Sequence, residues 1–198
     1  MCQLIESIQL KDGRFNNLRY HELRMNHSLK ELYGVSERIN LLHYLSLLDY
    51  PRKGVYKCRL LYDGLSRQAE FQPYTLKPIA SLKLIFDDAL VYNHKYADRS
   101  AIDQLVRQKG ECNDILIVKN GWVTDCSYAN IVFKSGNKWY TPDTYLLRGT
   151  MRQSLLETGE IEGQQIKVRD INKFEKFKLV NAMLGFEGQE CDISNIFS

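Results

Sequence analysis

Four short turn signals divide this chain into hairpins and constrain its fold more than any other feature. They are Asp12-Gly13, Asp63-Gly64, Asn120-Gly121 and Ser135-Gly136-Asn137. Asp-Gly and Asn-Gly pairs favour tight hairpin turns because these residues tolerate the positive φ angles that such turns require. Strand-like segments flank the signals, at residues 2–10, around Phe15, and at 54–63, 67–75, 113–120, 122–134 and 138–142. We therefore expect antiparallel strands that pair in chain order.

Helical patterns alternate with these strands, so the chain is expected to adopt an α+β fold. Asn17 stands in a capping position before a helix at 19–33, and Ser36 before a helix at 36–49 that Pro51 ends. The expected apolar face of this second helix consists of Ile39, Leu42, His43 and Leu47. Further helices are expected around 102–106, at 149–158 and at 171–177, and further strands at 81–87, 164–170 and 178–186. The pattern changes near residue 87, which predicts an N-terminal α+β lobe at 1–87 and a C-terminal strand-rich lobe at 88–198.

The composition excludes several classes of protein. Of the 198 residues, 44% are hydrophobic and 26% are charged, as in average globular domains and unlike disordered, collagen-like or coiled-coil chains. The 27 basic and 24 acidic residues leave a net charge of +3, too small and too evenly spread for a nucleic-acid-binding surface. The longest strongly apolar stretches, at 41–48 and 114–118, fall far short of the roughly 20 residues that span a bilayer. We expect neither a nucleic-acid partner nor a membrane segment.

The cysteines and histidines favour a reduced protein without a metal. The five cysteines are an odd number, form no CxxC pair and follow no leader-like segment, which indicates a cytoplasmic location. The four histidines have no ligand-like spacing to one another or to the cysteines, so no metal site is expected.

Two features could carry chemistry. Lys95 lies among apolar and aromatic residues, and a desolvated lysine is the type that forms Schiff bases. By itself the same pattern also describes a surface lysine whose stem lies along apolar neighbours. Gly149 precedes a predicted helix, where backbone N–H groups and the helix dipole favour a phosphate. A glycine in that position is also a common loop residue, so both alternatives stay open at this level.

Five ordered segments together resemble the class IV aminotransferase family, the fold-type IV enzymes that depend on pyridoxal phosphate. The segments are 5–34 (IESIQLKDGRFNNLRYHELRMNHSLKELYG), 92–100 (YNHKYADRS), 123–133 (VTDCSYANIVF), 140–157 (YTPDTYLLRGTMRQSLLE) and 178–186 (KLVNAMLGF). In the first segment the family's motif residues fall on Glu6, Asp12, Gly13, His21 and Arg24. The resemblance implies a D-amino-acid aminotransferase-like fold, with a small α/β sandwich and a strand-rich pseudo-barrel lobe.

The resemblance also implies a role for individual residues. Lys95 would bind the cofactor as an imine and serve as the catalytic base, and Asp125 would face the pyridine nitrogen. The cofactor-binding set so implied is Arg24, Lys95, Asp125, Gly149, Thr150, Met151 and Ala182. In this set Arg24 and the helix start hold the phosphate, and the backbone near Ala182 closes the pocket. Candidates for substrate contact or an outer supporting position are Arg99, Asn130, Asn181 and Tyr128. His21 is expected to be structural, and Arg152 to anchor its helix.

The chain departs from the family pattern at three places. Asp125 replaces the usual glutamate, Thr150-Met151 replaces Ile-Thr, and Ala182 stands where the aminotransferases have a small hydroxyl residue. Because Asp125 is one methylene shorter, contact with the pyridine nitrogen requires a backbone shift or an intervening water.

The family divides between amino-group transfer and the release of pyruvate from aminodeoxychorismate, which yields 4-aminobenzoate for folate synthesis. Met151-Arg152, the run from Asp125 to Asn130, the Asn181-Ala182-Met183 segment and Arg99 resemble the lyase. The sequence therefore predicts an aminodeoxychorismate lyase-like enzyme. The alternatives are an aminotransferase acting on a branched-chain or D-amino acid, and a catalytically degenerate relative that only binds the cofactor. The resemblance further implies a homodimer.

Overall fold

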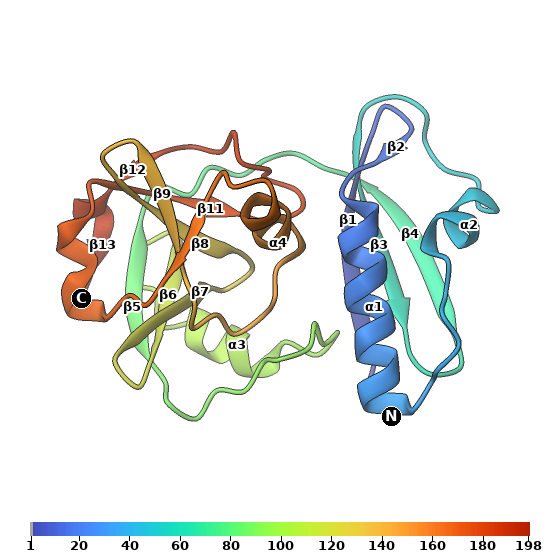
Figure 1. The fold of residues 1–198 in the computed structure, drawn as a ribbon, viewed down its shortest axis with the longest axis horizontal. Coiled ribbons are helices and arrows are strands. Elements are labelled where there is room, and N and C mark those ends of the chain that lie inside the picture. The colour runs from blue at the N-terminus through green and yellow to red at the C-terminus, as the bar shows by residue number, and fades with distance from the viewer. Residues whose placement is uncertain (1) are drawn as a thin grey trace. The chain divides into compact units, whose positions relative to one another are not determined.

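The computed structural model describes residues 2–198 and divides them into two compact units (Figure 1). The first unit comprises residues 2–76 together with 94–98, and the second comprises 77–93 together with 99–198. No helix among the described residues is long and apolar enough to cross a membrane.

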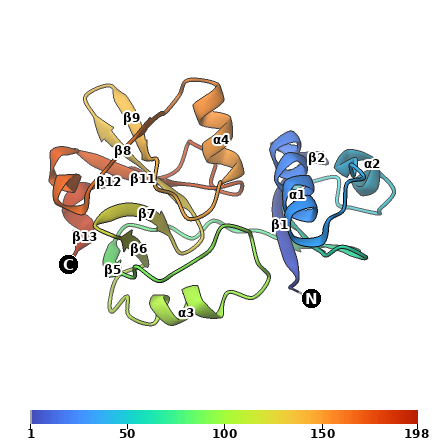
Figure 2. The same cartoon turned by 60° about the horizontal axis from the view of Figure 1, so that its bottom comes forward.

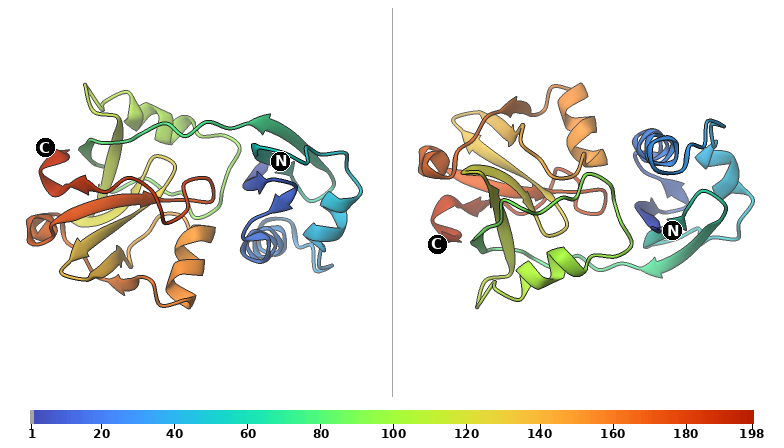
Figure 3. Two further views of the ribbon diagram at one scale, coloured as in Figure 1. Left: turned by 90° about the horizontal axis from the view of Figure 1, so that it is seen from above. Right: turned by 90° about the horizontal axis from the view of Figure 1, so that it is seen from below.

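A four-stranded antiparallel sheet forms the first unit, in the order β2-β1-β3-β4. The strands are β1 (Leu4–Lys11), β2 (Arg14–Phe15), β3 (Val55–Tyr62) and β4 (Arg67–Pro73). Alternate residues of β1 are buried, as in a strand with one face on the core. The helices α1 (Leu18–Tyr33) and α2 (Leu41–Ser46) cover this face, where Met25 and Leu45 pack with Leu4 and Leu60 (Figure 3).

The expected Asp12-Gly13 turn is confirmed, with φ angles of 48° and 77°. Helix α1 matches its prediction, although Asn17 occupies the capping position in a left-handed conformation and makes no side-chain cap. The prediction for 36–49 was wrong, since only Leu41–Ser46 is helical. The Asn26 side chain donates to the carbonyl of Ile39 and accepts from its amide, which holds that backbone outside the helix. Asn40 then caps α2 by accepting from the amide of His43.

Because α2 begins late, its buried face differs from the predicted one. Leu41 and Leu45 are buried, whereas Leu42 and Leu47 are exposed.

A nine-stranded sheet forms the second unit, in the order β10-β9-β8-β7-β6-β5-β13, with β11 between β8 and β12. Its strands are β5 (Leu82–Phe86), β6 (Asp114–Lys119), β7 (Trp122–Cys126), β8 (Asn130–Ser135), β9 (Lys138–Pro142), β10 (Glu162–Gln164), β11 (Lys176–Val180), β12 (Cys191–Asp192) and β13 (Ile196–Phe197). The helices α3 (Ser100–Val106) and α4 (Thr150–Glu157) lie on opposite sides of these strands (Figures 2 and 3). Two 3₁₀ helices, Val168–Lys173 and Ile193–Asn195, complete the unit. The 3₁₀ helix Val168–Lys173 covers the end of the strand predicted at 164–170 and the start of the helix predicted at 171–177, and β11 begins at Lys176, within that predicted helix.

The structure divides the chain differently from the expected boundary at residue 87. Strand β5 lies in the second unit because it pairs in parallel with β6, a partner more than 25 residues further along the chain. The segment 94–98, which carries Lys95, lies in the first unit rather than in the strand-rich one. The backbone carbonyl of Lys95 accepts from the amide of Ile5, and the amide of Ala97 donates to the carbonyl of Gln3. These hydrogen bonds attach the lysine segment to β1.

Candidate active site

In the first unit a buried polar network joins β1 to α1. Glu6 lies on the inward face of β1, and His21 and Arg24 lie three residues apart on one side of α1. Arg24 donates from Nε to Glu6 Oε1 at 2.9 Å and from Nη2 to Glu6 Oε2 at 2.5 Å, while His21 Nδ1 lies 2.6 Å from Oε2. Glu6 and His21 are fully buried, and the Arg24 side chain is 12% exposed. Glu6 thereby fixes the direction of the arginine.

Charge pairing outweighs burial in this network. Burial raises the pKa of Glu6, but the Arg24 charge and the hydrogen bonds from His21 and Arg24 bring that pKa down to about 2. Burial lowers the pKa of His21, Glu6 opposes this effect, and the positive charges of Arg24 and Lys95 reinforce it. His21 is therefore neutral at pH 7. Because an ionised Glu6 can only accept hydrogen bonds, Nδ1 of His21 carries the proton. This supports the structural role expected for His21.

Lys95 belongs to the same unit as this network. Its side chain is half-buried, and its charge acts on His21. The preceding residue, His94, is buried and pairs through Nδ1 with the Ser28 hydroxyl of α1 at 3.0 Å. The lysine segment is thus held by β1 through its backbone and by α1 through a neighbouring side chain.

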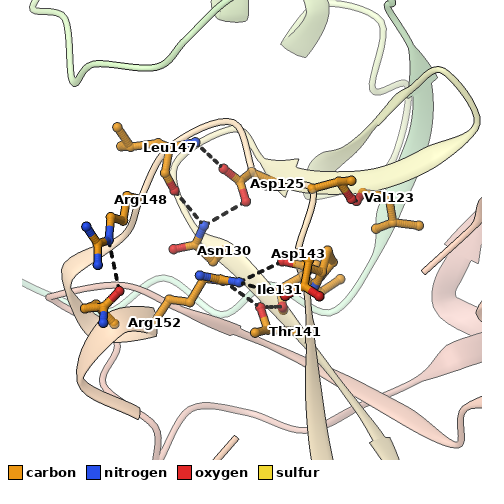
Figure 4. A network of polar contacts seen from close by, with 12 residues as sticks. Val123, Asp125, Asn130, Ile131, Thr141, Asp143, Leu147, Arg148 and Arg152 are labelled. Atoms are coloured by element: carbon orange, nitrogen blue, oxygen red, sulfur yellow. Dashed lines mark hydrogen bonds and ion pairs between the residues drawn. The ribbon is translucent and has the colours of Figure 1, made fainter. Parts of the chain in front are cut away.

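In the second unit Asp125 organises the loop before α4 (Figure 4). Asp125 is buried at the end of β7, and its Oδ2 accepts from the backbone amides of Leu146 (3.0 Å) and Leu147 (2.9 Å). Its Oδ1 accepts from Nδ2 of Asn130 at 2.7 Å, and the same Nδ2 also donates to the carbonyl of Leu147. Sequence motifs do not indicate the two leucine amides, because main-chain donors have no side-chain signature.

Burial dominates the electrostatics of Asp125. It raises the pKa of this carboxyl to about 6, although hydrogen bonds from Leu147, Asn130 and Leu146 and the charge of Arg152 lower it. Asp125 is therefore ionised at pH 7 but becomes protonated under mildly acidic conditions.

Position 149 requires a glycine because the Asn130 side chain lies very close to it, and not because of its φ angle. It is the N-cap of α4 in an extended conformation, and a Cβ built on it would lie 1.8 Å from Asn130 Oδ1. Thr150 and Met151 occupy the first turn of α4, where backbone N–H groups and the helix dipole favour an anion. Gly149 and Asn130 thus connect this helix start to Asp125.

Arg152 anchors its helix, as the sequence predicts. Its guanidinium is buried and donates to the Thr141 hydroxyl at 3.2 Å and to the Pro142 carbonyl at 2.9 Å. It also lies over the Tyr145 ring, 4.4 Å from the centroid. These contacts direct it to the end of β9 and the loop that follows.

Two of the candidate substrate residues bind backbone instead. Arg99 donates from Nη2 to the Ser127 carbonyl at 2.8 Å, and Asn181 donates from Nδ2 to the Tyr128 carbonyl at 3.2 Å. Asn181 Oδ1 also accepts from the amides of Met183 and Leu184, which forms a turn around the half-buried Ala182.

Comparison with known proteins identifies the family. The pattern of amino-transferase class IV matches residues 3–187. A protein of Haemophilus influenzae Rd, described only as uncharacterized, is 38% identical over 188 residues, which cover 93% of this chain and 100% of that protein. The crystal structure of a proposed 4-amino-4-deoxychorismate lyase from Haemophilus somnus 129pt is 34% identical, with a TM-score of 0.86, and the match covers 94% of this chain and 98% of that one. A hypothetical aminotransferase from Mycobacterium tuberculosis, solved in a PLP-bound form, has a TM-score of 0.76 at 17% identity, over 98% of this chain and 81% of that one.

The chain therefore belongs to the amino-transferase class IV family. It has the mixed α/β architecture of fold type IV and is a pyridoxal-phosphate-dependent lyase or aminotransferase that acts on a small molecule. The side chains present fit this cofactor. The first unit contains a lysine amine at Lys95 and an arginine cation at Arg24, and the second contains a carboxylate at Asp125 that is ionised at pH 7; an aldehyde, a phosphate and a pyridine nitrogen call for groups of these three kinds.

Proposed function

We propose that the protein releases pyruvate and 4-aminobenzoate from 4-amino-4-deoxychorismate, a step of folate synthesis. The observation that carries this proposal is the 34% identity to the proposed Haemophilus somnus lyase over 94% of the chain. Supporting it are the features that resemble the lyase rather than the aminotransferases, chiefly Met151-Arg152 and the Asn181-Ala182-Met183 segment.

In this proposal Lys95 would hold the cofactor covalently, and its amine, once the substrate amine has taken its place, would remove the proton from the amine-bearing carbon of the substrate. The bound cofactor supplies an electron sink for the charge left on that carbon. The bond from the substrate ring to the enolpyruvyl oxygen then breaks, and the departing group takes up a proton to become pyruvate. The ring keeps its amine and becomes 4-aminobenzoate, so no 2-oxo acid acceptor is consumed.

The remaining assigned residues bind and orient. Arg24, fixed by Glu6, and the first turn of α4 at Thr150 and Met151 hold the phosphate. Asp125 keeps the pyridine nitrogen protonated, and the turn around Ala182 closes the pocket. Three of the acceptor positions on the Asp125 carboxylate already receive hydrogen bonds, so one position remains for the ring nitrogen or an intervening water.

The reaction is tested with purified protein, pyridoxal phosphate and aminodeoxychorismate. Equal amounts of pyruvate and 4-aminobenzoate, formed without any 2-oxo acid, would support the lyase. If the protein instead converts a branched-chain or D-amino acid, and only when a 2-oxo acid is present, the aminotransferase alternative replaces the lyase proposal. Cofactor binding without turnover of any amine would indicate the degenerate relative.

Lys95 is tested separately from the reaction. Borohydride reduction of the holoenzyme followed by peptide mapping should place the cofactor on Lys95. Label on another lysine would contradict the assignment.

The proposal includes a homodimer in the cytoplasm. The five cysteines are an odd number and form no CxxC pair, the pattern from which we infer a reducing compartment. Light scattering coupled to gel filtration should give twice the chain mass of 23.1 kDa, whereas a single chain mass would contradict the dimer.

A further inference from the structure

The segment that carries Lys95 packs against one face of α1. Four polar residues, each three or four positions after the last, share this face: His21, Arg24, Ser28 and Glu31. The first two contact Glu6 of β1, and the last two contact His94, the residue that precedes the lysine. One helix therefore holds both the proposed phosphate-binding arginine and the neighbour of the proposed cofactor lysine.

His94 lies between two residues of this face. Its side chain is 5% exposed, its Nδ1 lies 3.0 Å from the Ser28 hydroxyl, and its Nε2 lies 3.4 Å from Oε2 of Glu31. The Tyr96 ring meets the imidazole edge-on, with 5.9 Å between the ring centroids. Ser28 is buried, whereas Glu31 is half-exposed, so the contact with Ser28 is the better protected from water.

The protonation of His94 fits both contacts. Burial lowers the pKa of His94, the charge of Glu31 opposes this effect, and His27 reinforces it. His94 is therefore neutral at pH 7. Because the Glu31 carboxylate can only accept a hydrogen bond, Nε2 carries the proton and Nδ1 accepts from the Ser28 hydroxyl. Both nitrogens of the ring thus have partners on α1, and the ring cannot turn without losing them.

The position of His94 limits where the Lys95 amine can lie. The two residues are adjacent, and the backbone carbonyl of Lys95 accepts from the amide of Ile5 on β1. The charge of Lys95 acts on His21, so the lysine lies toward the part of α1 that carries Arg24. A cofactor that is bound at its two ends has a fixed length, so its amine and its cation must keep a matching separation.

We propose that His94 is a positioning residue for the cofactor lysine, which pairs with Ser28 and thereby holds Lys95 at the separation from Arg24 that one cofactor molecule spans. The inference rests on the proposed roles of Lys95 and Arg24. It concerns the condensation in which the neutral Lys95 amine replaces the aldehyde oxygen of the cofactor, and that oxygen leaves with the two amine protons as water. His94 exchanges no proton in this step and only fixes where the amine lies.

The test compares two forms of the cofactor on the purified protein. Pyridoxal phosphate has the aldehyde that a lysine can bind, whereas pyridoxamine phosphate has an amine in its place and forms no covalent bond with a lysine. Absorbance titration measures the affinity for the first, and calorimetry measures the affinity for the second. A residue that positions Lys95 changes only the first affinity, whereas a residue that merely stabilises the unit changes both.

His94→Ala should lower the affinity for pyridoxal phosphate about tenfold and leave that for pyridoxamine phosphate within about twofold of the parent. Ser28→Ala, a substitution that favours the helix, should lower the first affinity by about two- to tenfold, the range for one neutral hydrogen bond. His94→Asn keeps a polar group at the position of Nδ1 and should stay within about threefold of the parent. His43→Ala, at an exposed histidine of α2, is the control and should change neither affinity.

Three results would contradict the positioning role. The first is an unchanged affinity for pyridoxal phosphate in both His94→Ala and Ser28→Ala. The second is an equal loss of both affinities in these variants, since His94 would then support the unit as a whole. The third is a His94→Asn protein that is as impaired as His94→Ala, because the contact with Ser28 would then not be the one that matters.

The parent protein separates this inference from the function on which it rests. Borohydride label on a lysine other than Lys95 would remove the inference. Label on Lys95 without release of 4-aminobenzoate would remove the lyase function and leave the role of His94 intact.

Discussion

Glu6 and Asp125 are two buried carboxylates that each accept three hydrogen bonds, yet their pKa values move in opposite directions. The pKa of Glu6 falls to about 2, and that of Asp125 rises to about 6. The partners of Glu6 include the guanidinium of Arg24, whereas Asp125 accepts from two backbone amides and one side-chain amide. The formal charge of the donors, rather than their number, therefore decides the protonation of a buried acid.

The difference suits the proposed roles of the two networks. Glu6 stays ionised over the whole physiological range and holds Arg24 in one orientation. Asp125 is negatively charged at pH 7, but none of its hydrogen-bond donors carries a formal charge. A protonated pyridine nitrogen of the cofactor would be the first charged donor to this carboxylate. Binding of the cofactor should accordingly lower the pKa of Asp125.

The largest expected effect comes from Glu6→Gln, which breaks the charged network. It leaves Arg24 without its carboxylate and places an amide donor against the guanidinium or against His21. The free energy of unfolding at pH 7 should fall by about 3–5 kcal/mol, as when one partner of a buried ion pair is removed. Urea denaturation measures this change. Glu31→Gln, at a half-exposed glutamate of α1, the helix that carries Arg24, should change this free energy by less than about 1 kcal/mol. Equal effects of the two variants would show that burial of the Glu6–Arg24 pair contributes nothing.

The opposite pKa shifts predict opposite dependences of stability on pH. The stability that ionised Glu6 contributes is present above pH 4.5 and is lost as the pH falls toward 2. For Asp125, folding favours the protonated form, so stability is greatest below pH 3.8 and decreases as the pH rises to about 6. Each window corresponds to about 3 kcal/mol at 1.36 kcal/mol per pKa unit.

Asp125→Asn should remove the second of these dependences. The difference in unfolding free energy between parent and variant should therefore change by about 3 kcal/mol between pH 3 and pH 7 and be constant above pH 7. Asp143→Asn, at an exposed aspartate of the loop before α4, is the control. A difference that does not vary with pH would mean that Asp125 titrates normally.

Arg24→Ala makes the Glu6 network resemble the Asp125 network, because Glu6 then has only the neutral His21 as a hydrogen-bond donor. The pKa of Glu6 should rise, since burial is no longer outweighed. Cofactor affinity should fall by about 1.5–3 kcal/mol, as for the loss of a charge-assisted contact. Absorbance titration with pyridoxal phosphate measures this affinity, with Arg19→Ala on the exposed side of α1 as the control. Unchanged affinity would remove Arg24 from the phosphate site.

The smallest expected effect tests the geometry around Asp125 without changing any charge. In Gly149→Ala the new methyl group would meet Asn130 Oδ1, so Asn130 must move from Asp125. We expect a loss of about 1–3 kcal/mol in the free energy of unfolding, measured in urea. Gly188→Ala, where the nearest atom lies 3.5 Å away, should be close to neutral. Equal values for the two variants would show that the loop adjusts freely.

Local signals in the sequence predicted much of this structure. The Asp12-Gly13 and Asn120-Gly121 turns depend on the φ angles of two neighbouring residues, so the sequence identifies them directly. Lys95, Asp125 and Gly149 were assigned through motifs whose order is preserved along the chain. The assigned roles of these three residues stay predictions until they are tested.

What the sequence did not predict depends on partners far along the chain. The late start of α2 depends on Asn26, 13 residues before Ile39. The place of β5 depends on its parallel pairing with β6, and no local pattern distinguishes that partner from β3. The pKa of Asp125 depends on the amides of Leu146 and Leu147, about 20 residues away.

The attachment of residues 94–98 to β1 has a consequence for synthesis on the ribosome. Most of the first unit leaves the ribosome by residue 76, but its lysine segment emerges only after β5, which belongs to the second unit. While β5 is being synthesised, the N-terminal half of β1 in the nascent first unit therefore has no lysine segment to pair with. Strand β5 likewise has no pairing partner until β6 has been synthesised. The segment with the proposed catalytic lysine is thus the last part of the first unit to be synthesised. The order of translation therefore brings Lys95 into place only after the rest of its unit is available to fold.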